Sequence, residues 1–385
     1  VTTPAPALPP APQPPTATTA PVAPAPSPVA TPARAPLPAA PPTQAVTAAP
    51  PPSPAARRAA TDTENHEANL AKWVAGAKQE GKLNYWATGT GKEIQGIANE
   101  FNKKYPFIKI EPWRGNTDDQ FEKLYAEHKA GKYTVDVFTL DPNYLPIMLK
   151  ENMLREMDTF YVKNWRQEDN DPKGRYSVQS YINLVIEYNT KLVKAEDVPK
   201  SFEDLTAAKW KKKVAVEENA IHWFLALARA WDWDKATEYL KRLKSNEALL
   251  YRGHTHVRDL NIAGEFPIAS EMYLFRIIQD MEKKKAPIDW TAPFVTSSIM
   301  FQGTLKNSPN PNSAALFHDW ITSPEGQRFY AAFTFRSVGD PNAPSAEDKA
   351  MAKKGSPKRV VVPGLFQGEN YERAEKVFRD ILWPK

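Results

Sequence analysis

The residues best suited to chemistry occur in short groups at the ends of expected strands. The first group is Thr88-Gly89-Thr90-Gly91, a turn between an expected strand at 82–86 and an expected helix at 92–104. Amide groups at the start of a helix, together with nearby hydroxyls, can hold an anion or another polar ligand. The alternative is an ordinary strand-to-helix turn. Trp86, just before the turn, could stack on a ligand or pack in the core.

Two further groups combine histidine with arginine, asparagine or tryptophan. The segment Arg252-Gly253-His254-Thr255-His256 alternates histidines, which on an extended segment would project from one face. They could form part of a metal site or lie in a solvent-facing loop. In the other group, Trp223 could stack on a flat or cationic ligand, with Asn219 and His222 beside it. Packing of Trp223 in the core explains the same pattern.

Alternating strands and helices must position these groups. Strands expected at 82–86, 108–113 and 135–140 alternate with helices at 92–104 and 119–130. The same alternation continues beyond residue 175, with strands expected at 181–188 and 297–301 and a helix expected at 272–283. A further helix should begin at 201–207, with Ser201 as its cap and Asp204 three residues on as the partner in a capping pair. Short turns between such elements indicate an α/β fold with a parallel sheet and helices on both faces.

The first 60 residues have a different composition. They contain 20 of the chain's 37 prolines and 19 alanines, but no aromatic, glycine or acidic residue. Such a segment has too little bulky apolar surface to offset the entropy of ordering it, so we expect a disordered, extended spacer. A helix capped by Thr63 should follow. The 325 residues from 61 to 385 are enough for about two domains.

Composition excludes several functions. The 385-residue chain has a net charge of +5, of which the spacer supplies +3, so its sequence pI of about 9.0 gives little support to nucleic-acid binding. The absence of cysteine excludes disulfides and thiolate metal sites. No apolar run approaches the ~20 residues of a membrane span. The Gly-x-Ser-x-Gly and His-Glu-x-x-His patterns are also absent, so we expect no enzyme.

Several runs, in their order and spacing, resemble the extracellular solute-binding proteins of bacterial ABC importers. The similarity extends from about Asn65 to Lys385 and is greatest to the ferric-binding and the phosphonate- or thiamine-binding branch. The runs that carry it are Glu80-Gly81-Lys82-Leu83-Asn84-Tyr85-Trp86, Val135-Asp136-Val137-Phe138, Glu187-Tyr188-Asn189-Thr190-Lys191-Leu192-Val193, Val198-Pro199-Lys200-Ser201-Phe202-Glu203-Asp204-Leu205, Lys209-Trp210-Lys211, Ala263-Gly264-Glu265-Phe266-Pro267-Ile268, Pro311-Asn312-Ser313-Ala314-Ala315 and Ser323-Pro324-Glu325-Gly326-Gln327. Lys212 departs from the family, which often has glycine there.

The resemblance implies two α/β lobes of the periplasmic-binding-protein type, joined by crossing strands that act as a hinge, with a ligand cleft between them. Its boundaries would be residues 61–178 for the first lobe and 179–292 for the second. Residues 293–343 would return to the first lobe, and residues 344–385 would pack on the second.

The resemblance also assigns roles to residues at the cleft. Thr88, Gly89 and Thr90 would contact ligand from the first lobe, as would Asp141, which could equally cap the turn at Pro142. Further contacts would come from the second lobe: Asn219, His222, Trp223, Arg252, His254, Glu271 and Tyr273.

Ferric-binding relatives carry adjacent tyrosines where this chain has Met272 and Tyr273. The loss of one phenolate places the usual ferric site in doubt, although Glu271 could compensate because carboxylates are hard oxygen ligands. Tyr273 could alternatively pack in the cleft wall. Whether a metal is bound is left open.

The expected function is therefore capture of a small polar ligand, either an anion or an oxygen-liganded metal complex, by closure of the lobes. The ligand would pass to a membrane permease without chemistry, cofactor or nucleic acid. The expected location is periplasmic or extracellular, with a possible membrane tether through the spacer. The alternative is a sensor or scaffold that uses the same fold to engage a partner protein. An open polar cleft would favour transport, and a filled or flat one would favour the scaffold.

Overall fold

The computed structural model describes residues 54–383, so residues 1–53 of the expected spacer lie outside the described residues. The described chain begins with helix α1, Pro54–Glu80. The expected helix cap at Thr63 is therefore wrong, because the helix begins before it and includes residues 54–60. Alanine and arginine are strong helix formers, and proline is tolerated in the first turn of a helix, so residues 54–60 can extend α1.

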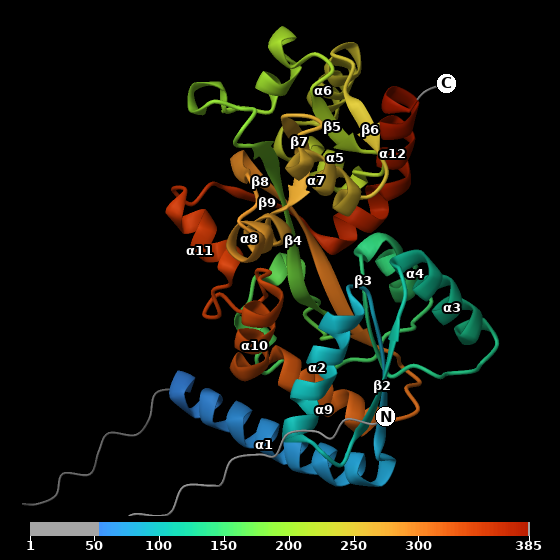
Figure 1. Ribbon diagram of the computed structural model, residues 1–385. Helices are drawn as coiled ribbons and strands as arrows, with labels where there is room; N and C mark the ends of the chain where they lie inside the picture. Colours follow the sequence, from blue (N-terminus) through green and yellow to red (C-terminus); the bar gives the residue numbers. More distant parts are fainter. Residues whose placement is uncertain (1–53, 384–385) are drawn as a thin grey trace, which may run out of the picture. The chain divides into compact units, whose positions relative to one another are not determined.

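A sheet forms the centre of the described residues, and its strands follow the order β2-β1-β3-β8-β4-β7-β5-β6, with β9 paired to β8 (Figure 1). The strand bounds are β1 (Lys82–Ala87), β2 (Lys109–Arg114), β3 (Val137–Leu140), β4 (Tyr176–Asn189), β5 (Val214–Glu217), β6 (Leu249–Tyr251), β7 (Ile268–Tyr273), β8 (Ile288–Thr304) and β9 (Arg359–Val362).

The two ends of this sheet are parallel, and long antiparallel strands connect them. At one end β1 pairs in parallel with β2 and β3, and at the other β5 pairs in parallel with β6 and β7. Strands β4 and β8 pair with each other along most of their length and reach both ends. The strands expected at 181–188 and 297–301 are the central parts of these two.

Helices cover both ends of the sheet (Figure 1). Besides α1, their bounds are α2 (Gly91–Lys104), α3 (Thr117–Lys129), α4 (Leu145–Lys150), α5 (Ile221–Ala230), α6 (Trp233–Ser245), α7 (His254–Ala263), α8 (Leu274–Lys284), α9 (Pro311–Thr322), α10 (Pro324–Thr334), α11 (Ala346–Lys353) and α12 (Gly364–Leu382). A short 3₁₀ helix, η1 (Pro142–Tyr144), follows β3.

Each end of the sheet has its own apolar core. Phe101, Phe317 and Trp320 are fully buried where α2 and α9 pack near β1. At the other end Trp223 and Phe378 are fully buried in a cluster that joins α5, α6 and α12. Burial of such large aromatic side chains is a dominant stabilising contribution in cores of this kind.

A buried polar contact holds α1 against the rest of the chain. Nδ1 of His66 lies 3.2 Å from Oδ2 of Asp158, and its Nε2 lies 3.2 Å from Oδ1 of Asp319 on α9. The imidazole also stacks on Phe160, with a ring-centroid distance of 4.1 Å. Helix α1 is thus fixed to α9 and to the segment before β4.

Two local predictions fail in an instructive way. The helix expected from Ser201 is only a 3₁₀ turn, Glu203–Thr206, although Ser201 and Asp204 do exchange the expected capping bonds. The segment expected to be extended at 252–256 enters helix α7 at His254. Since successive helical residues turn by about 100°, His254 and His256 do not project from one face.

The α/β fold is confirmed, but the sheet is mixed and not wholly parallel as expected, because β4 and β8 run antiparallel to each other and to their neighbours β7 and β3. Lys212, where the family often has glycine, has a φ of 59°, in the left-handed region that favours glycine. Among residues 54–383, no helix is both long and apolar enough to cross a membrane. The lobe boundaries at residues 178, 292 and 343 remain predictions.

Candidate ligand-binding site

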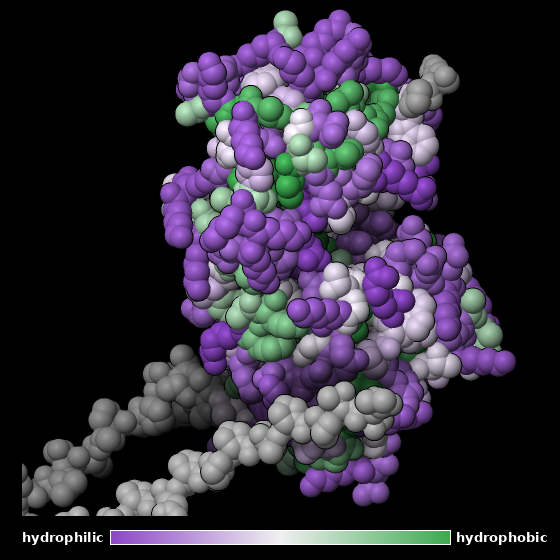
Figure 2. All heavy atoms as spheres, in the orientation of Figure 1, coloured by the Kyte–Doolittle hydropathy of each residue, from purple (hydrophilic) through white to green (hydrophobic). Residues whose placement is uncertain are grey.

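A cavity of about 370 Å³ lies where strand-to-helix turns from both ends of the sheet meet. The carboxyl ends of β1, β2, β3, β5, β6 and β7 all lead into its wall, and β4 and β8 pass along it. Figure 2 shows a recess bordered mainly by hydrophilic residues, between the part carrying α7 and α8 and the part carrying α3 and α4. The carboxyl ends of parallel strands are natural ligand sites in α/β proteins.

Five helices begin at the cavity wall. Helix α2 is capped by Thr90, and α3 is capped by Asn116. In contrast, α5, α7 and α8 begin at Ala220, Gly253 and Tyr273 without any side-chain capping bond. Their first N–H groups lack the usual side-chain acceptor, and helix starts carry partial positive charge. The wall therefore offers backbone donors to a ligand that brings acceptor atoms.

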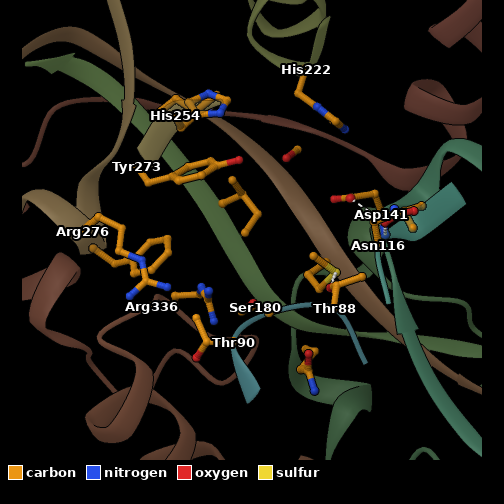
Figure 3. Close-up of a pocket in the computed structure, with 18 of the residues that line it drawn as sticks. Thr88, Thr90, Asn116, Asp141, Ser180, His222, His254, Tyr273, Arg276 and Arg336 are labelled. Atoms are coloured by element: carbon orange, nitrogen blue, oxygen red, sulfur yellow. Dashed lines mark hydrogen bonds between the residues drawn. The ribbon is translucent and has the colours of Figure 1, made fainter. Parts of the chain in front are cut away.

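Two arginines lie side by side on one side of the cavity (Figure 3). The Arg336 side chain is only 11 % exposed, and its Nε is buried without a hydrogen-bond partner. Arg276 and Arg336 both approach Oε1 of Glu93, at 3.7 and 3.5 Å, and both lie near the ring of Phe275. Guanidinium groups held in this way are well placed to bind an oxyanion.

The adjoining part of the wall contains neutral hydrogen-bonding groups, and Tyr273 lies next to Phe275, with ring centroids 5.7 Å apart. His254 stacks on Tyr273 with ring centroids 4.3 Å apart, and His222 points toward the same space from α5 (Figure 3). Nε2 of each histidine is buried without a partner. Burial, with a smaller contribution from His222, lowers the pKa of His254 to about 3. Burial likewise raises the pKa of Tyr273 above its usual range, so both side chains are uncharged near neutral pH.

A carboxylate completes the third side of the cavity. Oδ2 of Asp141 accepts a hydrogen bond of 2.7 Å from the Thr117 hydroxyl. Asp141 occupies the N-cap position of η1, as expected, but its side chain makes no capping bond there. The lining residues thus carry three arginines (Arg114, Arg276, Arg336) against one aspartate, so the cavity favours an anion.

Nine of the twelve predicted site residues line this cavity. They are Thr88, Gly89, Thr90, Asp141, Asn219, His222, Trp223, His254 and Tyr273. Trp223 is also a core residue, because it is fully buried among Phe202 and Tyr239 and presents only part of its surface to the cavity. Ligand contact by these residues is a proposal, developed below.

Trp86 and Arg252 lie elsewhere. The Trp86 side chain is buried against Trp113, with Nζ of Lys123 lying 4.6 Å from its ring centroid. Arg252 has a side chain 86 % exposed, and its Nε lies 3.7 Å from Glu218. A charged side chain at the end of a short strand gains more from hydration than from burial beside uncharged imidazoles.

Glu271 is fully buried beneath the cavity wall, so it does not line the cavity either. Its carboxyl group accepts a 2.6 Å hydrogen bond from the Glu217 backbone N–H. The Glu217 carboxylate in turn accepts from the backbone N–H groups of Asn219 and Gly253, in the turns that lead to His222 and His254. Burial raises the pKa of Glu271 well above its usual value. Glu271 therefore supports the site from below.

Sequence reasoning missed several residues that line the cavity. Arg276 lies within a helix already expected at 272–283, and Arg336 follows α10 outside any recognised motif. The others are Arg114, Asn116, Thr117, Ser180, Ser298 and Tyr330. Arg276 could have been predicted from its position three residues after Tyr273, in the first turn of the expected helix. The first turn of a helix that follows a strand lies close to the carboxyl end of that strand, where the cavity is. Arg336 carries no such local signal.

The pair Met272 and Tyr273 does not form a phenolate pair. Met272 is buried in an apolar cluster with Val185 and Phe266, whereas Tyr273 faces the cavity. Adjacent residues of a strand point to opposite faces, which explains the difference. Within the described part of the chain, no group of three or more His, Asp or Glu side chains is arranged to hold a metal ion.

Comparisons with known proteins agree with this architecture. Residues 96–356 match the family described as bacterial extracellular solute-binding protein. A Haemophilus influenzae protein described only as uncharacterized is 25 % identical over 269 residues, which cover 65 % of this chain and 75 % of that protein.

Solved structures share the fold at low sequence identity. Iron-bound HitA from Pseudomonas aeruginosa has a TM-score of 0.64 and 19 % identity, over 78 % of this chain and 99 % of its own. The periplasmic binding protein AfuA from Actinobacillus pleuropneumoniae, with fructose 6-phosphate bound, has a TM-score of 0.62 and 20 % identity, over 78 % of this chain and 98 % of its own. An iron- and citrate-bound protein from Trichodesmium has a TM-score of 0.65 and 20 % identity, over 79 % of this chain and 100 % of its own.

The fold and its cavity define a periplasmic-binding-protein type of solute receptor, and the chain belongs to the bacterial extracellular solute-binding protein family. The predicted family, fold and general function are thereby confirmed.

Proposed function

We propose that this protein is the binding component of an ABC importer and that its ligand is a small anion with a phosphate-like or carboxylate group. The observation that carries the proposal is the pair Arg276 and Arg336 at a cavity ringed by helix starts, three of them uncapped. Oxyanions combine charge with several acceptor atoms, so they match both the guanidinium groups and the free N–H donors.

The anion binds at the arginine side, and the rest of the ligand lies toward His222, His254 and Tyr273. These three side chains offer uncharged donors and acceptors, which suit hydroxyl groups of a ligand body. Asp141, on the third side, would disfavour a second anionic group there. The structurally similar AfuA holds fructose 6-phosphate, which makes sugar phosphates a natural first class to test.

A ferric ion held by protein side chains alone is a weaker match, because Met272 points into the core. The sensor or scaffold alternative is also less favoured, since the cavity is open and polar rather than filled. Closure of the two halves of the sheet about β4 and β8 would bring both parts of the wall onto one ligand. The closed form would then be the state that a membrane permease recognises outside the cytoplasm, with the amino-terminal segment serving as a tether.

Ligand binding can be tested by titration calorimetry with inorganic phosphate, fructose 6-phosphate, citrate and ferric citrate. We expect a phosphate-bearing compound to bind. Arg336→Ala and Arg276→Ala should each weaken binding about 10- to 100-fold, which is the usual loss for a charge-assisted hydrogen bond. Arg252→Ala, which removes an exposed arginine outside the cavity, is the matched control and should leave the affinity unchanged.

Two results would contradict the proposal. One is wild-type protein that binds none of the four compounds. The other is an equal loss of affinity in Arg252→Ala and Arg336→Ala, which would show that general surface charge, and not the cavity, attracts the anion.

A further inference from the structure

Arg336 lies on a segment with no regular secondary structure, between the end of α10 and the start of α11. Helix α10 ends at Thr334, and the C-cap residue Phe335 has a left-handed φ of 71°, which turns the chain sharply. Without other restraints, a residue at such a position would have a mobile backbone. Arg336 nevertheless reaches the cavity with its side chain almost buried.

Glu347, at the start of α11, holds the backbone on both sides of Arg336. Its own N–H donates a 3.2 Å hydrogen bond to the carbonyl of Phe335. Its Oε2 accepts a 2.8 Å hydrogen bond from the N–H of Ser337. Glu347 thus bonds to the peptide groups immediately before and after Arg336, while the Arg336 N–H donates a 3.3 Å hydrogen bond to Oγ1 of Thr334. The Glu347 side chain is fully buried, so neither contact competes with water.

The same carboxylate is bonded to the strands that connect the two ends of the sheet. Nδ2 of Asn183 on β4 donates to Oε2 of Glu347 at 2.7 Å and to Oγ of Ser337 at 3.0 Å. Oδ1 of Asn183 accepts a 2.9 Å hydrogen bond from Ser297 on β8. The Ser337 carbonyl also accepts from the N–H of Tyr181 on β4. A continuous set of hydrogen bonds therefore joins β8, β4 and the Arg336 segment.

We propose that Glu347 is a positioning residue of the anion site, which fixes Arg336 in the cavity and couples its position to strands β4 and β8. Glu347 does not line the cavity and acts only through Arg336. A shift of β4 against β8 would be transmitted to the guanidinium group, and an anion bound there would favour one arrangement of the two strands. This inference rests on the proposed function, because it concerns the affinity of the same site.

Affinity for inorganic phosphate in four variants tests the proposal. Glu347→Ala should weaken binding about tenfold or more, whereas Glu347→Gln should stay within about threefold of wild type. The glutamine can keep the three bonds through its oxygen, since Oε1 of Glu347 has no partner to lose. Glu187→Ala truncates an equally buried glutamate on β4 whose carboxylate oxygens have no hydrogen-bond partner, and it should leave the affinity unchanged. Glu347→Asp, one methylene shorter, serves in place of Glu347→Ala if the latter does not fold.

The double variant Arg336→Ala/Glu347→Ala separates positioning from general loss of structure. If Glu347 acts through Arg336, the double variant should bind phosphate as weakly as Arg336→Ala alone, within about twofold. The inference would be overturned if the double variant lost affinity by the product of the two single-variant factors, since Glu347 would then act independently of Arg336. Equal losses of affinity in Glu347→Ala and Glu187→Ala would also overturn it. Neither result would contradict the proposed function. Wild-type protein that binds no phosphate would instead contradict the proposed function and this inference with it.

Discussion

Substitution of Glu187 by glutamine should stabilise the protein at high pH and not at low pH. Glu187 lies on β4, is fully buried, and neither of its carboxylate oxygens has a hydrogen-bond partner. Burial raises its pKa from 4.5 to about 8, with Arg258 acting in the opposite direction. The folded state therefore holds this proton up to about pH 8, while the unfolded state releases it above about pH 4.5.

The sign and size of the effect follow from this difference. Between pH 4.5 and 8 the unfolded state binds fewer protons, so the stability that neutral Glu187 contributes is fully present below pH 4.5 and is lost as pH rises to 8. A difference between pKa 4.5 and about 8 corresponds to roughly 3–5 kcal/mol. Glutamine does not titrate, so the free energy of unfolding of Glu187→Gln, compared with wild type, should rise by that amount between pH 4 and pH 9.

Urea denaturation followed by tryptophan fluorescence at pH 4, 6.5 and 9 gives these free energies. Glu238→Gln, on the exposed surface of α6, is the matched control and should differ from wild type by less than about 0.5 kcal/mol throughout. An unchanged difference between Glu187→Gln and wild type at pH 4 and pH 9 would refute the reasoning, because Glu187 would then have the same pKa in the folded and unfolded states.

Three other outcomes are expected. Since the pKa of His254 is lowered to about 3, its imidazole stays neutral above pH 5. The ratio of the sulfate affinities of wild type and His254→Gln, measured by calorimetry, should therefore be constant from pH 5 to 8. A ratio that rises at low pH would show a charged imidazole. Gly253→Ala should lower the free energy of unfolding by about 1–2 kcal/mol, because φ is 87° there, and an unchanged melting temperature would contradict this. Phe378→Ala should cost about 3–5 kcal/mol in urea denaturation, whereas the exposed control Leu192→Ser should cost little; similar losses would argue against the described core.

The sequence was most informative where a local pattern determines the structure. Alternating strands and helices predicted the α/β fold, and the turn at Thr88 to Thr90 was correctly placed before a helix. It was less informative about length: β8 extends well beyond the expected 297–301, since its two ends pair with different partners that no local pattern reveals.

For the site, residues at strand ends could be predicted because a strand-to-helix turn identifies itself. Arg336 could not, because its place in the cavity depends on Glu347 and Asn183, which are distant in sequence. Glu271 was predicted to contact ligand, yet it serves the site by holding the Glu217 backbone. Residue type alone does not distinguish a wall residue from the residue supporting it.

The attachment of α1 determines how a mechanical load would enter the protein. Helix α1 leads into the amino end of β1, whereas the cavity lies at the carboxyl end of that strand. Tension on the chain before Pro54 would pass through α1 and its His66 contacts into α9. A tether pulling there would strain the edge of the sheet remote from the cavity, so the mouth would stay unobstructed and the grip on a captured solute would be unaffected by the pull.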